Sequence, residues 1–206
     1  GAEAIGADTA GFKLPDDKIE GGIGDVVEVR LGVAGDFRAA RLSLGAAYFL
    51  QRYQDLVDFD FEQFLHVNRS RVRTQGVELS ARWRPHPTLG LDAEATYLDA
   101  QDLDGGVLLH EPRWTGGVRL TWQPDERLSL RLQARAVSGS YDQQIPVPDR
   151  DTVDGYSLVG LAGSWRVHDG WTLRARLDDL ADRSYETLIG FPGPGRSFWL
   201  GVGWDR

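Results

Sequence analysis

The chain of 206 residues contains no cysteine, so it has neither a disulfide framework nor a cysteine-based metal site. It also contains no methionine, and its first residues lack the basic and apolar parts of a signal peptide, so we expect any leader to have been removed already. Basic residues are also outnumbered by acidic ones, 23 to 31. The formal net charge of −8 argues against nucleic acid as a partner.

Long hydrophobic runs are missing too. No stretch reaches the length of about 18 apolar residues that a transmembrane helix needs. This absence leaves open strands that cross a membrane, because their apolar residues are interleaved with polar ones.

What the sequence does have is apolar and polar residues in alternation. Between residues 128 and 135, apolar residues alternate with Ser129, Arg131, Gln133 and Arg135. Side chains of a strand point alternately to its two faces, so the pattern predicts strands with one apolar and one charged face. It recurs in nine segments of about ten residues: 26–34, 40–51, 74–84, 89–99, 113–123, 128–138, 156–167, 171–180 and 197–205. We expect residues 1–20 to supply a tenth strand.

The connections between these segments alternate in length. Short turns are expected at Gly35-Asp36, Pro85-His86-Pro87, Pro124-Asp125 and His168-Asp169-Gly170. Long loops are expected at 52–73, 100–112, 138–155 and 180–196. Outer-membrane barrels have short periplasmic turns and long extracellular loops. The sequence therefore predicts an all-β fold, an antiparallel transmembrane β-barrel of nine or ten strands that is either part of a larger barrel or a reduced one.

Aromatic residues near the strand ends favour the same fold, because such rings are most stable at the headgroup level. They are Tyr48, Trp83, Tyr97, Trp114, Trp122, Trp171 and Trp204. A soluble barrel or sandwich with rim aromatics is the alternative. In the membrane interpretation, the lipid face includes Leu42, Leu79, Leu91, Leu120, Leu132 and Leu173. On the opposite, charged face we favour cross-strand ion pairing over ligand contact.

Five segments of the sequence match motifs of one protein family. Residues 179–186, DLADRSYE, resemble the box N-L-[FT]-D-[KR]-x-Y, and residues 190–197, GFPGPGRS, resemble G-[YF]-x-x-P-G-R-[ST]. The others are FKLP at 12–15, the entry into a strand at 68–79 with GVEL at 76–79, and YLDA at 97–100. Taken in chain order, the five segments resemble motifs of the TonB-dependent outer-membrane receptors, in which the first box quoted belongs to the penultimate strand. Asp179 departs from the asparagine that is usual in the family.

The resemblance implies a larger parent, because such transporters have about 22 strands and a plugged lumen. Residues 1–206 are then the C-terminal part of a receptor barrel, without a plug domain or a TonB box. The implied function is uptake of a scarce, bulky nutrient, such as an iron–siderophore complex or cobalamin, in the outer membrane of a Gram-negative bacterium. The implied partners are outer-membrane lipid and either another polypeptide or a missing N-terminal barrel and plug segment.

Other functions stay open at this point. The chain could be a structural or split-barrel scaffold partner without transport of its own, a soluble redesign, or an outer-membrane protease-like enzyme using residues such as Asp149, Asp151, His66 and His110. We expect no enzyme activity, no catalytic residue, no cofactor and no metal. Asp55, Asp58, Asp60 and Glu62 could hold Ca²⁺, but they alternate with apolar residues and are better interpreted as an extended strand end.

In the family, ligand specificity lies in the outer loops and the plug. The resemblance therefore implies weak ligand-binding candidates on the predicted outer loops: Tyr53, Phe64, His66, Tyr141, Gln143, Gln144 and Phe191.

Overall fold

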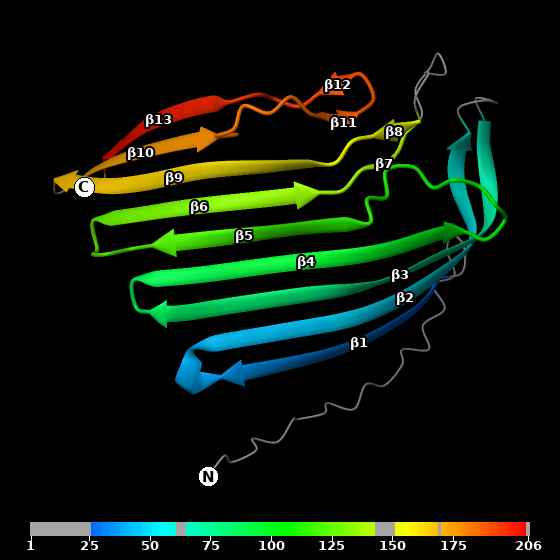
Figure 1. The fold of residues 1–206 in the computed structure, drawn as a ribbon, viewed down its shortest axis with the longest axis horizontal. Coiled ribbons are helices and arrows are strands. Elements are labelled where there is room, and N and C mark those ends of the chain that lie inside the picture. The colour runs from blue at the N-terminus through cyan, green and yellow to red at the C-terminus, as the bar shows by residue number, and fades with distance from the viewer. Residues whose placement is uncertain (1–25, 61–64, 143–150, 169, 205–206) are drawn as a thin grey trace, which may run out of the picture.

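The computed structural model describes residues 26–60, 65–142, 151–168 and 170–204 (Figure 1). Nine strands form one antiparallel sheet in the order β1-β2-β3-β4-β5-β6-β9-β10-β13. Their bounds are Val26–Phe37, Leu42–Asp60, Leu65–His86, Leu89–Asp102, Trp114–Trp122, Leu128–Val137, Tyr156–His168, Trp171–Asp178 and Ser197–Trp204. The all-β antiparallel prediction and all nine strand segments are confirmed. The expected tenth strand, at residues 1–20, lies outside the described residues.

Four short strands lie beyond the sheet, on the connections at its long-loop end. β7 (Ser140–Tyr141) pairs with β8 (Thr152–Val153), and β11 (Glu186–Leu188) pairs with β12 (Phe191–Pro192). The helical structure in the described part is one 3-10 turn, η1 (Arg38–Ala40). No helix among those residues is both long and apolar enough to cross a membrane.

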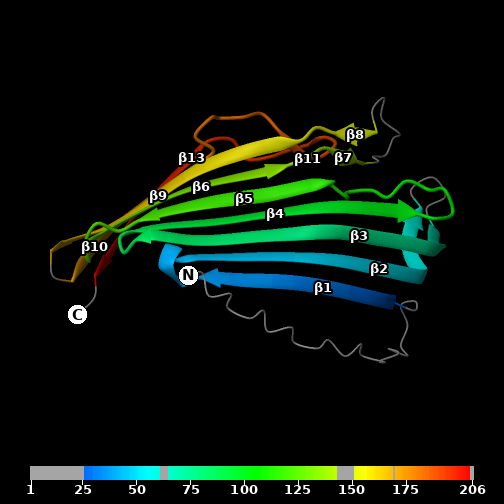
Figure 2. The same cartoon turned by 60° about the horizontal axis from the view of Figure 1, so that its bottom comes forward.

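The register keeps one phase of side chains together across the whole sheet. Leu91 pairs with Leu120, Leu120 with Leu132, and Leu132 with Leu161. One residue further along, Asp92 pairs with Arg119 and Arg119 with Gln133. Because a slip by one residue would exchange the two faces, this register fixes an apolar and a charged surface on opposite sides. The sheet is curved across its strands rather than flat (Figure 2).

Aromatic residues form two rows on the apolar side, as predicted. Near the long loops, Tyr97 packs against Trp114 at 4.7 Å between ring centroids. Near the short turns, Trp171 packs against Trp204 at 6.5 Å. Along β4, the residues that pair with Trp114 and Trp122 are Tyr97 and Leu89. That separation is roughly 27 Å along the strand, which after strand tilt suits an apolar band of about 25 Å.

One of the turn predictions needs correction. The turn expected at Gly35-Asp36 lies within β1, where these residues pair with Leu44 and Ser43, and the chain reverses at residues 38–41 instead. The alternating apolar residues of β1 continue to Phe37, so the pairing of β1 with β2 also continues to that residue. Arg41 takes the left-handed conformation that closes the turn, with φ 50°. The predicted turn at Pro124-Asp125 is confirmed: the Asp125 carboxylate accepts the Arg127 and Leu128 N–H groups, which lower its pKa.

The loop expected at 52–73 is also corrected, because most of it is strand. β2 runs to Asp60 and β3 starts at Leu65, and the two are paired from Tyr53↔Val72 to Asp60↔Leu65. The backbone at Asp55, Asp58 and Asp60 is therefore extended, as the alternation of acids with apolar residues indicated. Beyond Val72, where the pairing of β3 with β4 ends, β2 and β3 continue together as a hairpin (Figure 1).

The assigned faces predict different costs for the same charge at adjacent positions. Leu132→Arg should destabilise the protein folded in lipid vesicles by roughly 2–4 kcal/mol, because it places a cation in the hydrocarbon layer. Gln133→Arg, the matched control on the charged face, should cost much less. Urea unfolding in vesicles measures both, and equal costs would contradict the assignment of faces.

The unequal connections predict an orientation, which can be tested because the native chain has no cysteine. Val107→Cys, in the long β4–β5 connection, should react with a membrane-impermeant maleimide on intact cells, since that end faces the medium. Glu126→Cys, in the short β5–β6 turn, should react only after the outer membrane is opened. The reverse labelling pattern would mean that the sheet is inserted the other way round.

Candidate functional site

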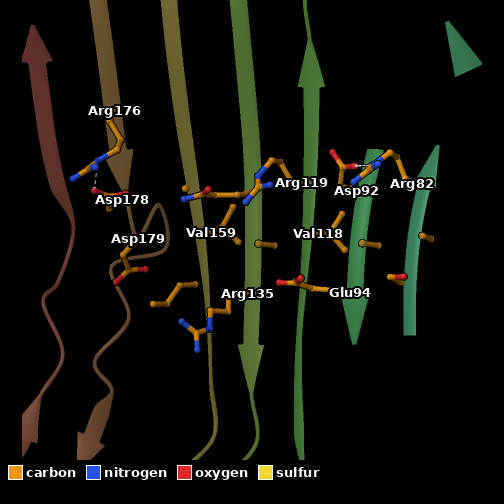
Figure 3. Close-up of a pocket in the computed structure, with 18 of the residues that line it drawn as sticks. Arg82, Asp92, Glu94, Val118, Arg119, Arg135, Val159, Arg176, Asp178 and Asp179 are labelled. Atoms are coloured by element: carbon orange, nitrogen blue, oxygen red, sulfur yellow. Dashed lines mark hydrogen bonds and ion pairs between the residues drawn. The ribbon is translucent and has the colours of Figure 1, made fainter. Parts of the chain in front are cut away.

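The charged face of the sheet carries the largest hollow in the described part of the chain, with a volume of about 1170 Å³. The alternation on β4, β5, β6 and β10 brings Asp92, Glu94, Arg119, Arg135 and Arg176 to it (Figure 3). Small residues in the same phase, such as Gly45, Gly117 and Gly160, leave the space above the backbone open. The result is a polar wall that borders a volume large enough to hold many water molecules, rather than a packed core.

Ion pairs neutralise part of this wall. Asp92 accepts from Arg84 at 2.9 and 3.0 Å and from Arg82 at 3.4 Å. Arg30 pairs with Glu78 across β2. The prediction of cross-strand pairing is confirmed for these residues. Exposed pairs of this kind contribute about 0–1 kcal/mol each, so their main effect is on charge balance rather than stability.

Other arginines of the wall are not neutralised in this way. Arg176 pairs with Asp178 on its own strand, at 2.8 Å. Arg119 and Arg135 lie between that pair and Asp92 in Figure 3. Among the described residues, neither of them has an acidic partner within ion-pair distance. The wall therefore presents free guanidinium groups toward the hollow.

At the long-loop end, one buried carboxylate joins three connections. Asp142, only 4% exposed, follows β7 on the β6–β9 connection. Its Oδ1 lies 2.7 Å from His110 Nε2 on the β4–β5 connection, and its Oδ2 accepts the Ile189 N–H on the β10–β13 connection at 2.6 Å. The His110 N–H also donates to the Tyr141 carbonyl at 2.8 Å. We call Asp142, His110 and Ile189 the loop junction.

The loop junction brings together segments that carry two of the seven predicted ligand-binding residues. Tyr141 directly precedes Asp142 and is 49% exposed; Phe191 follows Ile189 by two positions and is 59% exposed. Both rings are therefore available at the same end of the sheet.

The other candidates are placed differently. Tyr53 lies on β2 in a separate hollow of about 550 Å³ that Glu111 also lines. Burial raises the pKa of the Tyr53 hydroxyl, with smaller contributions from Glu28 and Glu111. His66 is placed by its backbone alone, opposite Phe59. The remaining three lie outside the described residues: Phe64, Gln143 and Gln144.

Sequence reasoning missed the loop junction. Asp142 and Ile189 carry no motif, and His110 was considered only in the protease-like alternative. Its partner is Asp142 rather than Asp151, one of the acids named with it in the protease hypothesis. Asp149, the other acid, is outside the described residues.

Comparison with known proteins identifies the family. The family model described as "TonB dependent receptor-like, beta-barrel" matches residues 27–180. The chain belongs to the TonB-dependent receptor family. It is an outer-membrane β-barrel protein of a Gram-negative bacterium, as the resemblance predicted.

One curated relative is the vitamin B12 transporter BtuB of Vibrio cholerae, which is 43% identical over 54 residues, 26% of this chain and 9% of that protein. Among solved structures, the Pseudomonas aeruginosa receptor FpvA has a TM-score of 0.73 at 19% identity, over 88% of this chain and 27% of that chain. The ferric-catecholate import receptor Fiu of Escherichia coli K12 has a TM-score of 0.72 at 19% identity, over 87% of this chain and 27% of that chain. These structures support the fold, and the chain spans about a quarter of their length.

The two C-terminal family motifs fold against each other in this receptor segment. The Asp182 carboxylate accepts the Arg196 N–H at 2.9 Å. Gly193 donates to the Tyr185 carbonyl, and a Cβ at Gly193 would lie 2.0 Å from the Tyr185 ring, so only glycine fits there. These motif residues thus shape the β10–β13 connection, which positions Ile189 for the loop junction.

Asp179, which departs from the family's asparagine, is 4% exposed in the same connection. Its Oδ2 accepts the Arg183 N–H at 2.8 Å, and its buried Oδ1 has no hydrogen-bond partner among the described residues. An asparagine would place an N–H donor in one of these two positions. The departure from asparagine therefore changes the local hydrogen bonding at this position.

Removing the shared carboxylate should release the loop junction and leave the sheet intact. Asp142→Ala deprives the buried Ile189 N–H of its acceptor, which should cost about 1–3 kcal/mol locally. Hydrogen exchange of the Ile189 amide should accelerate accordingly, while exchange in β5 and β6 stays slow. Asp142→Asn keeps an acceptor and should have a smaller effect.

Asp151→Asn is the matched control, because Asp151 contributes its backbone carbonyl, rather than its side chain, to the bond with Asp142. Unchanged exchange at Ile189 in Asp142→Ala would contradict the junction.

Proposed function

We propose that the chain is the C-terminal barrel segment of an outer-membrane receptor that takes up a scarce, bulky nutrient such as an iron–siderophore complex or cobalamin. The observation that carries the proposal is the pairing of an apolar face with a charged face that borders a hollow of about 1170 Å³. Such a sheet separates lipid from a polar lumen. The named relatives, which include a vitamin B12 transporter and a ferric-catecholate import receptor, support this class of cargo.

The edges of the sheet support a partner. In the described part, β1 and β13 are the two edges and do not pair with each other. Each unpaired backbone group in lipid costs several kcal/mol, so both edges need further strands. We propose that these strands, and a plug inside the barrel, come from the rest of the receptor or from another polypeptide. The chain alone is then not a working transporter.

The outer end of the barrel is the proposed point of first contact with the nutrient. Tyr141 and Phe191 present exposed rings on connections that the loop junction holds together. Aromatic side chains bury large apolar areas at little entropic cost, which suits recognition of bulky complexes. Tyr53 is proposed as a more peripheral contact. For Phe64, His66, Gln143 and Gln144 the proposal rests on the family resemblance alone.

Uptake in cells tests the proposal. A strain lacking the receptor gene, complemented with wild type, should regain uptake of either radiolabelled iron–catecholate siderophore or radiolabelled cobalamin. A protonophore should abolish that uptake, since energy comes from the inner membrane. Tyr141→Ala and Phe191→Ala should each raise the half-saturating concentration about fivefold, as expected for loss of about 1 kcal/mol of contact.

Leu103→Ala, also an exposed apolar residue beyond the sheet, is the control and should have no effect. A correctly assembled receptor that restores uptake of neither cargo would favour the structural or split-barrel alternative.

A further inference from the structure

A second, smaller hollow on the charged face lies near the short-turn end, between β6, β9, β10 and β13. Its volume is about 300 Å³. Arg131, Arg174 and Arg176 line it together with Trp199 and the hydroxyl-bearing residues Ser129 and Ser164. No acidic side chain lines it. It therefore differs from the larger hollow, whose lining includes Asp92, Glu94 and Asp178.

The register explains why the space exists. Ala162 stands between Arg131 and Arg176 in one row across the sheet, and Ser164 stands between Ser129 and Arg174 in the next. Arg131 and Arg176 are thus two strand spacings apart, about 10 Å between backbones. Long arginine side chains on both sides of a short one enclose a space into which their guanidinium groups can converge.

Two glycines of β13 leave room for the side chains of Trp199 and Arg174. A Cβ at Gly201 would lie 2.2 Å from the Trp199 ring, and a Cβ at Gly203 would lie 2.9 Å from Arg174 Nη1. The indole and the guanidinium therefore lie directly over bare backbone. Side-chain atoms at either glycine would displace them. The two glycines therefore maintain the positions of the Trp199 and Arg174 side chains.

Two of the three guanidinium groups are free to bind. Arg176 pairs with Asp178 through Nε at 2.8 Å. Within the described part of the chain, Arg131 and Arg174 form no ion pair. Clustered cations without counter-charge raise the local potential, and planar guanidinium groups bind oxyanions with two parallel hydrogen bonds.

We propose that this hollow is a binding site for a small oxyanion, such as phosphate or a carboxylate solute, on the luminal wall. The proposal rests on the proposed assignment of the charged face to the lumen, but not on the identity of the transported nutrient. Arg131 and Arg174 provide the charge and the hydrogen-bond forks, Ser129 and Ser164 add neutral donors, and Trp199 closes one side.

Binding of inorganic phosphate to the full receptor, purified in detergent and in chloride buffer, tests the site. Equilibrium dialysis with radiolabelled phosphate should show saturable binding by wild type. The double variant Arg131→Gln, Arg174→Gln should bind at least tenfold more weakly. The matched control is Arg119→Gln, Arg135→Gln, which removes the same charge from the same face outside the hollow and should change binding less than twofold.

Equal weakening in both double variants would mean that binding follows general charge, and absence of saturable binding in wild type would mean that protein already fills the hollow; either result overturns the proposal. If the glutamine variant fails to assemble, Arg131→Lys, Arg174→Lys keeps the charge and loses the forks, and unchanged binding there overturns it as well. Nutrient uptake, measured separately, distinguishes failure of this site from failure of the transport function.

Discussion

The fold depends on one constraint: inside a bilayer every backbone N–H and C=O must find a partner within the protein. A strand meets this need only through its neighbours, so the nine strands exist as a sheet or not at all. Once the strands must pair, the two-residue period of the sequence determines which side chains share a face. Register turns an alternating sequence into two continuous surfaces, and the apolar surface, lined by residues such as Leu91, Leu120 and Leu132, selects the register.

The charged surface follows from the same alternation but is less strictly determined. Lumen positions tolerate many polar residues, so their charges can serve other purposes. Near Asp92 two arginines have a carboxylate partner, whereas the hollow beside Trp199 has no acidic side chain in its lining. A wall of uniform geometry thus contains chemically distinct regions. The difference arises from which strands carry acids: β4 supplies Asp92 and Glu94, while β6 carries arginine without acid in its polar phase.

How much could be predicted from the sequence differs between the sheet and its ends. Strands were predictable because period-two alternation is local, and the nine segments were located to within a few residues except where β2 and β3 extend into the hairpin. The loop junction was not predictable, because Asp142, His110 and Ile189 are far apart in the chain and each of the three interactions involves a backbone group or a lone histidine. The family motifs predicted identity, but Asp182 and Tyr185 shape a connection and do not mark a ligand site.

Because a single carboxylate fastens three connections, those connections cannot change independently over evolutionary time. A deletion in the β4–β5 connection that moves His110, or an insertion that shifts Ile189, removes a partner from Asp142 even if the altered loop tolerates the change. Under the proposed uptake function, a change of cargo specificity is therefore expected more readily from substitution of exposed residues beside the junction than from altered loop lengths. The β2–β3 hairpin is held differently: its strands pair with each other, and at its base Arg71 pairs with Asp104 of the β4–β5 connection.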